Sequence, residues 1–175
     1  MSYTKNTVEC YSIRPDEDNR HRCLWALIYV DSNTWTLSAS SDCGDYSYRW
    51  GYEEGRIFKK FLTTLDKSYF LSKISRRTEV DEKESILRMK EYCIDMYREG
   101  SINKQEAREQ FDHIKDIEAG YYDDDFEHAI YENLDYDYND LVVYKYPVGA
   151  ITFYEIVFRE LQKILKNEIE GENKE

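Results

Sequence analysis

Residues 23–50 read CLWALIYVDSNTWTLSASSDCGDYSYRW, and this stretch decides the fold class. Its first part, 23–30, is a strongly apolar run that predicts a central strand. Residues 34–40 and 46–50 alternate apolar or aromatic side chains with small or polar ones, which is typical of half-buried strands. Two links that favour turns, Asp-Ser-Asn and Ser-Asp-Cys-Gly, join the three runs. With an edge strand over 8–13, the sequence predicts an antiparallel meander.

Helical periodicity follows the predicted meander. Apolar residues recur every three or four positions over 57–65, 82–99 and 103–117. The last two segments begin with an Asp or Asn and a Glu three positions later, which is the pattern of a capping box. A short link after Gly100 joins them, so we expect an αα-hairpin. A closing helix is expected over about 149–168.

The length of 175 residues suits one domain. The sequence therefore predicts a single α+β domain, in which the N-terminal antiparallel sheet packs against C-terminal helices that include the αα-hairpin. A short helix is expected over 124–133 and a strand over 141–146. The predicted segments are a β-meander over 1–55, helices with the αα-hairpin over 56–120, an acidic Tyr/Asp tract over 121–140, a strand and the closing helix over 141–170, and a frayed tail over 171–175.

The net charge of −12 disfavours general binding to nucleic acids or anionic membranes, because their phosphates attract Lys and Arg. The four cysteines show no CxxC spacing, and the three histidines have no mutual metal-ligand spacing. The sequence contains no GxSxG, HExxH or P-loop motif. We therefore expect no enzyme, no metal and no cofactor. The N-terminal MSYTKNTVEC lacks the apolar core of a signal peptide, so we expect a cytoplasmic protein with reduced thiols.

Residues 122–140, YDDDFEHAIYENLDYDYND, carry eight carboxylates and no Lys or Arg. Carboxylates three or four residues apart on a helix lie about 5–6 Å from one another, a spacing comparable to that of phosphates along a nucleic-acid strand. We interpret the tract as a partner-binding face; the alternatives are a solvated loop that favours solubility and, less favoured, a metal site without the EF-hand pattern. The predicted acidic contacts are Asp123, Asp124, Asp125, Glu127, Glu132, Asp135, Asp137 and Asp140, with Tyr131, Tyr136 and Tyr138 as contact anchors.

A second candidate site is basic. Residues 56–77 carry seven Lys or Arg side chains and one Asp. Together with the strand over 46–50, this segment could bind a small signalling nucleotide through the set Tyr48, Arg49, Trp50, Lys59, Lys60, Arg76 and Arg77. The alternatives are solvated helix faces, or pairing with the acidic tract of this chain or of a second copy in a homodimer.

The stretch over 41–75 resembles small proteins encoded by tailed phages and prophages. The similar features are SDxGxYxYRW, followed by FxxFLxxLDxxYFxxK, and the late YPVGAITFYEIVFREL is similar to the aromatic closing helix of that group. The resemblance implies a protein of the host bacterial cytoplasm. By association it implies an inhibitor of bacterial defence, such as an anti-CRISPR protein, that binds a basic nucleic-acid-guided nuclease through the acidic tract and binds neither nucleic acid nor membrane directly. A nucleotide-binding sponge and a virion structural or assembly protein are the alternatives.

Overall fold

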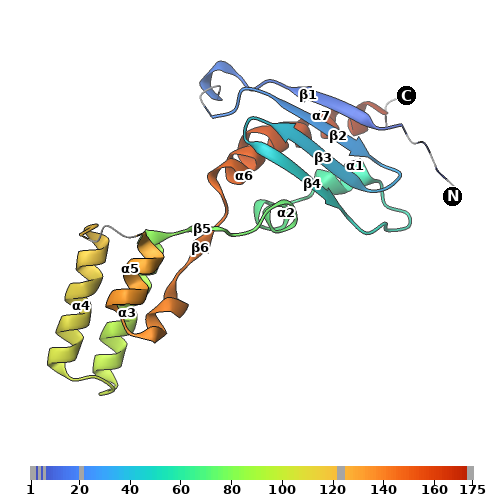
Figure 1. Ribbon diagram of the computed structural model, residues 1–175. Helices are drawn as coiled ribbons and strands as arrows, with labels where there is room; N and C mark the ends of the chain where they lie inside the picture. Colours follow the sequence, from blue (N-terminus) through green and yellow to red (C-terminus); the bar gives the residue numbers. More distant parts are fainter. Residues whose placement is uncertain (1–2, 4, 6, 20–21, 122–124, 173–175) are drawn as a thin grey trace. The chain divides into compact units, whose positions relative to one another are not determined.

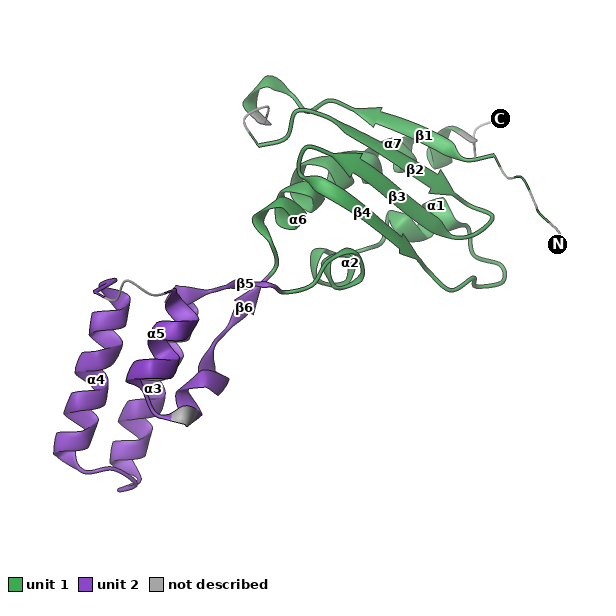
Figure 2. Ribbon diagram, in the orientation of Figure 1, with its two compact units in different colours: residues 1–77, 146–175 green, residues 78–145 purple. Residues whose placement is uncertain are grey.

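The computed structural model describes all residues except 1–2, 4, 6, 20–21, 122–124 and 173–175. The chain forms two compact units, shown in green and purple in Figure 2. Unit 1 comprises Met1–Arg77 and Tyr146–Glu175, and unit 2 comprises Thr78–Lys145. Each unit has its own cluster of buried hydrophobic residues. Whether the two units unfold together as the single predicted domain stays a prediction.

Unit 1 contains a four-stranded antiparallel sheet whose strands follow one another in chain order (Figure 1). The Asp31 carboxylate accepts hydrogen bonds from the backbone N–H groups of Asn33 and Thr34 and so fixes the first tight turn of the sheet. Gly44 opens the last strand with a φ of 127°, a value that residues with a Cβ rarely adopt. The predicted antiparallel meander is therefore confirmed, with β1 over Glu9–Ile13, β2 over Ala26–Asp31, β3 over Thr36–Ser41 and β4 over Gly44–Arg49.

The central strand β2 begins at Ala26, three residues later than the apolar run predicts. The Asp42 carboxylate accepts hydrogen bonds from the backbone N–H groups of Leu24 at 2.6 Å and Trp25 at 3.4 Å. These bonds occupy two N–H groups that would otherwise join the ladder, and both side chains are exposed. An acidic side chain from the β3–β4 turn thus ends the strand where hydrophobicity alone would extend it.

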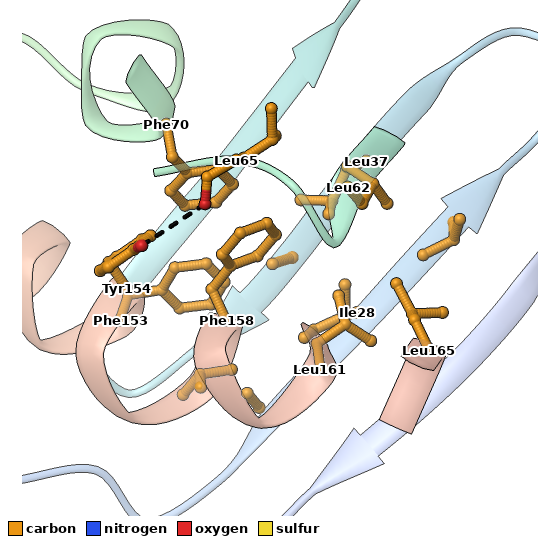
Figure 3. Packing of buried hydrophobic residues seen from close by; sticks show 14 of the residues in the cluster. Ile28, Leu37, Leu62, Leu65, Phe70, Phe153, Tyr154, Phe158, Leu161 and Leu165 are labelled. Carbon is orange, nitrogen blue, oxygen red and sulfur yellow. Dashed lines mark hydrogen bonds between the residues drawn. The ribbon is translucent and has the colours of Figure 1, made fainter. Parts of the chain in front are cut away.

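Helices of unit 1 cover one face of the sheet. Figure 3 shows Phe153, Tyr154 and Phe158 of the closing helix gathered around Phe70, and these aromatic side chains share one buried cluster with Ile28 and Leu37 of the sheet. The ring of Phe158 stacks on that of Phe70 at a centroid distance of 3.7 Å, and both side chains are fully buried. These helices are α1 over Phe58–Leu62, α2 over Lys67–Ile74, α6 over Val148–Thr152, the π-helical η3 over Phe153–Phe158 and α7 over Arg159–Glu172; a short 3₁₀ turn, η1, spans Glu17–Asn19.

The closing helix differs from the regular α-helix that its periodicity predicts. Its middle is a π-helical segment, η3, which buries three aromatic side chains and Val157. Within it, the Tyr154 hydroxyl donates to the carbonyl oxygen of Leu65 at 3.5 Å (Figure 3). At its start, Gly149 lies so close to the β3–β4 turn that an added Cβ would be 2.4 Å from the carbonyl oxygen of Cys43. Glycine at this position therefore permits close packing of helix and turn.

Unit 2 is built around the predicted αα-hairpin of α3, Glu82–Arg98, and α4, Lys104–Glu118. The Asn103 side chain and Glu106 form the expected capping box at the start of α4. Ile86, Met89 and Ile114 from the hairpin pack with buried side chains of the acidic tract in one hydrophobic cluster. The rest of unit 2 consists of β5 over Glu79–Val80, α5 over Phe126–Asn133, the 3₁₀ helix η2 over Tyr136–Leu141 and β6 over Tyr144–Lys145.

The strand predicted over 141–146 is wrong in extent. Only Tyr144–Lys145 is a strand, and it pairs antiparallel with Glu79–Val80, which is too short to show a period in the sequence. The preceding residue, Val143, is held by one side chain and one backbone group: its N–H donates to the hydroxyl of Ser85 at 2.9 Å, and its carbonyl oxygen accepts the N–H of Asp81 at 2.7 Å. Ser85 is fully buried and also donates to the carbonyl oxygen of Asp81 at 2.7 Å.

Candidate partner-binding face

The whole net charge of the chain lies in unit 2. This unit of 68 residues, Thr78–Lys145, carries 20 acidic and 8 basic side chains, a net charge of −12. Unit 1 carries 16 acidic and 16 basic side chains, a net charge of 0. The charge asymmetry expected from the sequence therefore coincides with the boundary between two separately packed cores.

Helix α5 presents several of the predicted acidic contacts. Asp125 caps the helix by accepting a hydrogen bond from the backbone N–H of His128 at 3.0 Å, and Glu127, Tyr131 and Glu132 are exposed. The Glu127 carboxylate accepts a hydrogen bond from the hydroxyl of Tyr144, and this bond raises the pKa of that tyrosine. The Asp123 and Asp124 predictions lie outside the described residues.

The remaining acids lie at the 3₁₀ helix η2: Asp135 directly precedes it, Asp137 and Asp140 lie within it, and all three are exposed. The Asp135 carboxylate accepts from the amide of Gln110 at 2.5 Å, and the Asp137 carboxylate accepts from the hydroxyl of Tyr92 at 3.3 Å. Both donors belong to the αα-hairpin, so the structure holds these two carboxylates in place on a helical scaffold. The side chain of Tyr136 lies outside the described part of the chain.

Tyr138 is a core residue, so its prediction as a contact anchor at the surface is wrong. Its side chain is 1% exposed, and its ring meets that of Tyr92 edge-on at a centroid distance of 5.3 Å. Its hydroxyl donates to the side-chain carbonyl of Gln110 at 2.7 Å, and burial raises its pKa. The acidic neighbours of Tyr138 made a surface position the expectation, but the 3₁₀ turn directs this ring inward.

An acidic groove of about 630 Å³ lies between α4 and the α5–η2 connection. Sequence reasoning anticipated two of its carboxylates, Glu132 and Asp135, and missed Glu106 and Glu109 because they lie in a different helix. His113 lines the same groove, where its Nδ1–H donates to the carbonyl oxygen of Asn133 at 2.8 Å. The groove is lined by Ile102, Glu106, Glu109, Gln110, His113, Glu132, Asn133, Leu134 and Asp135.

The basic candidate set is not assembled into one ligand site. Lys59 is paired with the carboxylates of Glu9 at 2.6 Å and Glu168 at 3.0 Å. Burial lowers the pKa of Lys59, but these two carboxylates outweigh that effect and raise it. Trp50 is 5% exposed, so its ring belongs to the unit 1 core and has little surface on which a base could stack.

The other members of this set are dispersed. Arg49 is exposed on the sheet strand β4, whereas Tyr48 is half-buried and faces the core side. The guanidinium of Arg77 lies 5.2 Å from the ring centroid of Tyr146. This ring therefore covers one of the cationic side chains that were expected to bind the nucleotide. Lys60 and Arg76 are exposed.

Among the described residues, no helix has the length and apolar character needed to cross a bilayer. Comparisons with curated proteins and with solved structures find no match for this chain. The model of a protein family described as a phage family matches residues 1–167, which is nearly the full length. The chain therefore belongs to this phage family.

Proposed function

We propose that this phage protein is a non-enzymatic inhibitor of bacterial defence that binds a cationic nucleic-acid-binding protein of the host through unit 2. The observation that carries the proposal is the charge partition, because unit 2 has a net charge of −12 and unit 1 has none. The net charge therefore has a defined location. A concentrated negative charge of this kind attracts a surface that evolved to hold phosphates.

The fixed position of the carboxylates supports a binding role. Asp135 and Asp137 are held by donors from the αα-hairpin, and Glu127 is held by Tyr144. Binding through groups that are already ordered loses less conformational entropy than binding through a free acidic loop. The acidic groove adds concave surface that could receive a Lys or Arg side chain.

The target class follows from this electrostatic complementarity together with the phage origin. A nucleic-acid-guided nuclease has a cationic channel, and unit 2 would obstruct it sterically and compete with phosphates for its Lys and Arg side chains. Association would be fast at low ionic strength and would weaken as salt screens the charges. The nucleotide sponge and the virion protein stay predictions, and no contact described above favours either.

The test uses two matched double variants. Glu109→Lys with Glu132→Lys reverses two exposed acids of the acidic groove, and Glu54→Lys with Glu170→Lys reverses two exposed acids of unit 1. Each reversal adds two units of charge, so both variants change the net charge from −12 to −8. Only the position of the change differs between them.

Plaque formation is measured on a host whose nucleic-acid-guided nuclease targets the phage, with each variant supplied from a plasmid. We expect that the groove variant no longer protects the phage from the nuclease. It should also bind the purified nuclease at least tenfold more weakly, a loss of about 1.4 kcal/mol in binding free energy. The unit 1 variant should protect and bind like the wild type. Equal loss in both variants, or full protection by the groove variant with normal expression, would contradict the proposal.

A further inference from the structure

Two cysteines and an aspartate meet at one end of the unit 1 sheet. The Sγ atoms of Cys23 and Cys43 and a carboxylate oxygen of Asp42 all lie within 4.8 Å of one another. Cys23 precedes β2, whereas Asp42 and Cys43 form the turn between β3 and β4. The antiparallel register, which places Ala26 opposite Ser41, brings these distant segments together.

The local hydrogen bonds hold the three side chains in place. Oδ1 of Asp42 accepts the thiol of Cys23 at 3.2 Å, and its Oδ2 accepts the backbone N–H of Leu24 at 2.6 Å. The backbone N–H of Trp25 also donates to Oδ1 of Asp42, at 3.4 Å, so backbone donors hold both oxygens of this carboxylate. On the other side, the carbonyl oxygen of Cys43 accepts the hydroxyl of Tyr46 at 2.7 Å, which fixes the turn.

We propose that Cys23, Cys43 and Asp42 bind a thiophilic divalent cation, Zn²⁺ or a close analogue, with water as the fourth ligand. Zn–S bonds of about 2.3 Å and Zn–O bonds of about 2.0–2.2 Å give a tetrahedron with ligand–ligand edges of about 3.6–3.8 Å. The Asp42 Oδ1 lies 3.2 Å from the Sγ of Cys23 and 4.0 Å from that of Cys43. Both distances fall within about 0.5 Å of the required edge.

The surroundings of the two thiols favour the binding of a metal ion. While Oδ1 of Asp42 binds the ion, Oδ2 keeps its hydrogen bond to Leu24, the kind of outer contact that orients a carboxylate ligand. Two thiolates select Zn²⁺ over Mg²⁺ or Ca²⁺, which prefer oxygen ligands. Cys23 is fully buried, but Cys43 is half-buried and Asp42 is exposed, so an ion and its water can reach the site from that side.

Metal binding at this site has a defined proton balance. The thiolate is the form of cysteine that binds metals, whereas an ordinary thiol, with a pKa of about 8.5, is mostly protonated at neutral pH. Formation of two metal–sulfur bonds therefore breaks two S–H bonds and releases two protons per ion. The bound ion would cross-link the segment before β2 to the β3–β4 turn. This role lies entirely within unit 1 and does not depend on the function proposed for unit 2.

The test adds Co²⁺ and then Zn²⁺ to the full-length protein, purified metal-free and kept reduced with a phosphine. We expect one Co²⁺ per chain, a thiolate-to-cobalt charge-transfer absorption that Zn²⁺ abolishes, and release of two protons per Zn²⁺ in a weakly buffered indicator solution. Absence of this absorption in the wild type overturns the proposal.

Variants identify the ligands. Cys43→Ser should lose the absorption and bind Co²⁺ at least tenfold more weakly. Asp42→Asn keeps both thiols and should still bind Co²⁺ more weakly than the wild type. Cys10→Ser and Cys93→Ser remove the other two thiols, one exposed and one buried in unit 2, and should bind like the wild type. Circular dichroism of the metal-free variants verifies that each is folded. Unchanged absorption in Cys43→Ser, or its loss in Cys10→Ser, would overturn the assignment.

Discussion

Replacement of Tyr138 by Phe tests whether this residue is a core residue or a surface anchor. The change keeps the ring and its edge-on contact with Tyr92 and removes only the hydroxyl that donates to Gln110 at 2.7 Å. Such a hydrogen bond contributes about 0.5–1.5 kcal/mol, and an acceptor left unpaired in the interior costs about 1–3 kcal/mol. Gln110 is only half-buried, so water can partly replace the lost donor. We therefore expect a loss of about 1–2 kcal/mol in the free energy of unfolding.

The assay is urea unfolding followed by two signals. All three tryptophans lie in unit 1, so their fluorescence reports its unfolding, whereas far-ultraviolet circular dichroism also reports the helices of unit 2. Tyr131→Phe is the matched control, because that side chain is 66% exposed and should leave the midpoint unchanged. An unchanged midpoint for Tyr138→Phe in both signals would refute the reasoning. A shift of both signals would confirm the single predicted domain, and a shift confined to circular dichroism would show that the two units unfold separately.

Three further predictions concern unit 1. Phe158→Ala should cost about 3–5 kcal/mol in urea unfolding monitored by tryptophan fluorescence, because the ring is fully buried against α2. Gly149→Ala should cost about 1–3 kcal/mol in the same assay because its Cβ would meet a backbone carbonyl oxygen, whereas Gly171→Ala, with open space around it, should not destabilise the protein. The Lys67 and Arg22 side chains lower the pKa of Glu155 in the folded protein below the usual 4.5. The ionised carboxylate therefore stabilises the fold above pH 4.5, and this stabilisation is lost as the pH falls through the pKa of the folded state. The stability difference between the wild type and Lys67→Met should therefore narrow in acid, and a difference that stays constant down to the acid transition would contradict this pairing.

Local patterns predicted most of the secondary structure. Alternation over 34–40 and 46–50 identified β3 and β4, because one face of each strand packs on the helices while the other meets water. The capping patterns at Asp81 and Asn103 located the starts of α3 and α4 because both side chains bond the first turn of their own helix. These features depend on residues within a few positions of one another, so the sequence alone contains the information.

The features that the sequence did not predict depend on distant contacts. The late start of β2 is set by Asp42, which lies 18 positions after the N–H group of Leu24 that it binds. The inward position of Tyr138 depends on Gln110, 28 residues earlier in α4. The cysteine and aspartate cluster likewise requires the strand register, because spacing along the chain gives no metal-ligand motif. Tertiary contacts override local patterns at each of these positions.

The salt dependence of the unfolding temperature tests whether the excess negative charge of unit 2 destabilises its fold. With 20 acidic and 8 basic side chains in 68 residues, unit 2 repels itself when folded, and its basic side chains are too few to neutralise it. The screening length falls from about 30 Å at 0.01 M salt to about 8 Å at 0.15 M, so salt should relieve this repulsion. We expect the unfolding temperature, followed by circular dichroism, to rise over that range in the wild type.

The two double variants used to test binding separate charge from position in this experiment as well. Glu109→Lys with Glu132→Lys removes repulsion within unit 2 and should reduce the salt effect, whereas Glu54→Lys with Glu170→Lys should leave it close to that of the wild type. An equal salt effect in both variants would mean that the repulsion is not local to unit 2. A cationic partner would relieve the same repulsion between carboxylates as salt does. Unit 2 should therefore become more stable when such a partner binds.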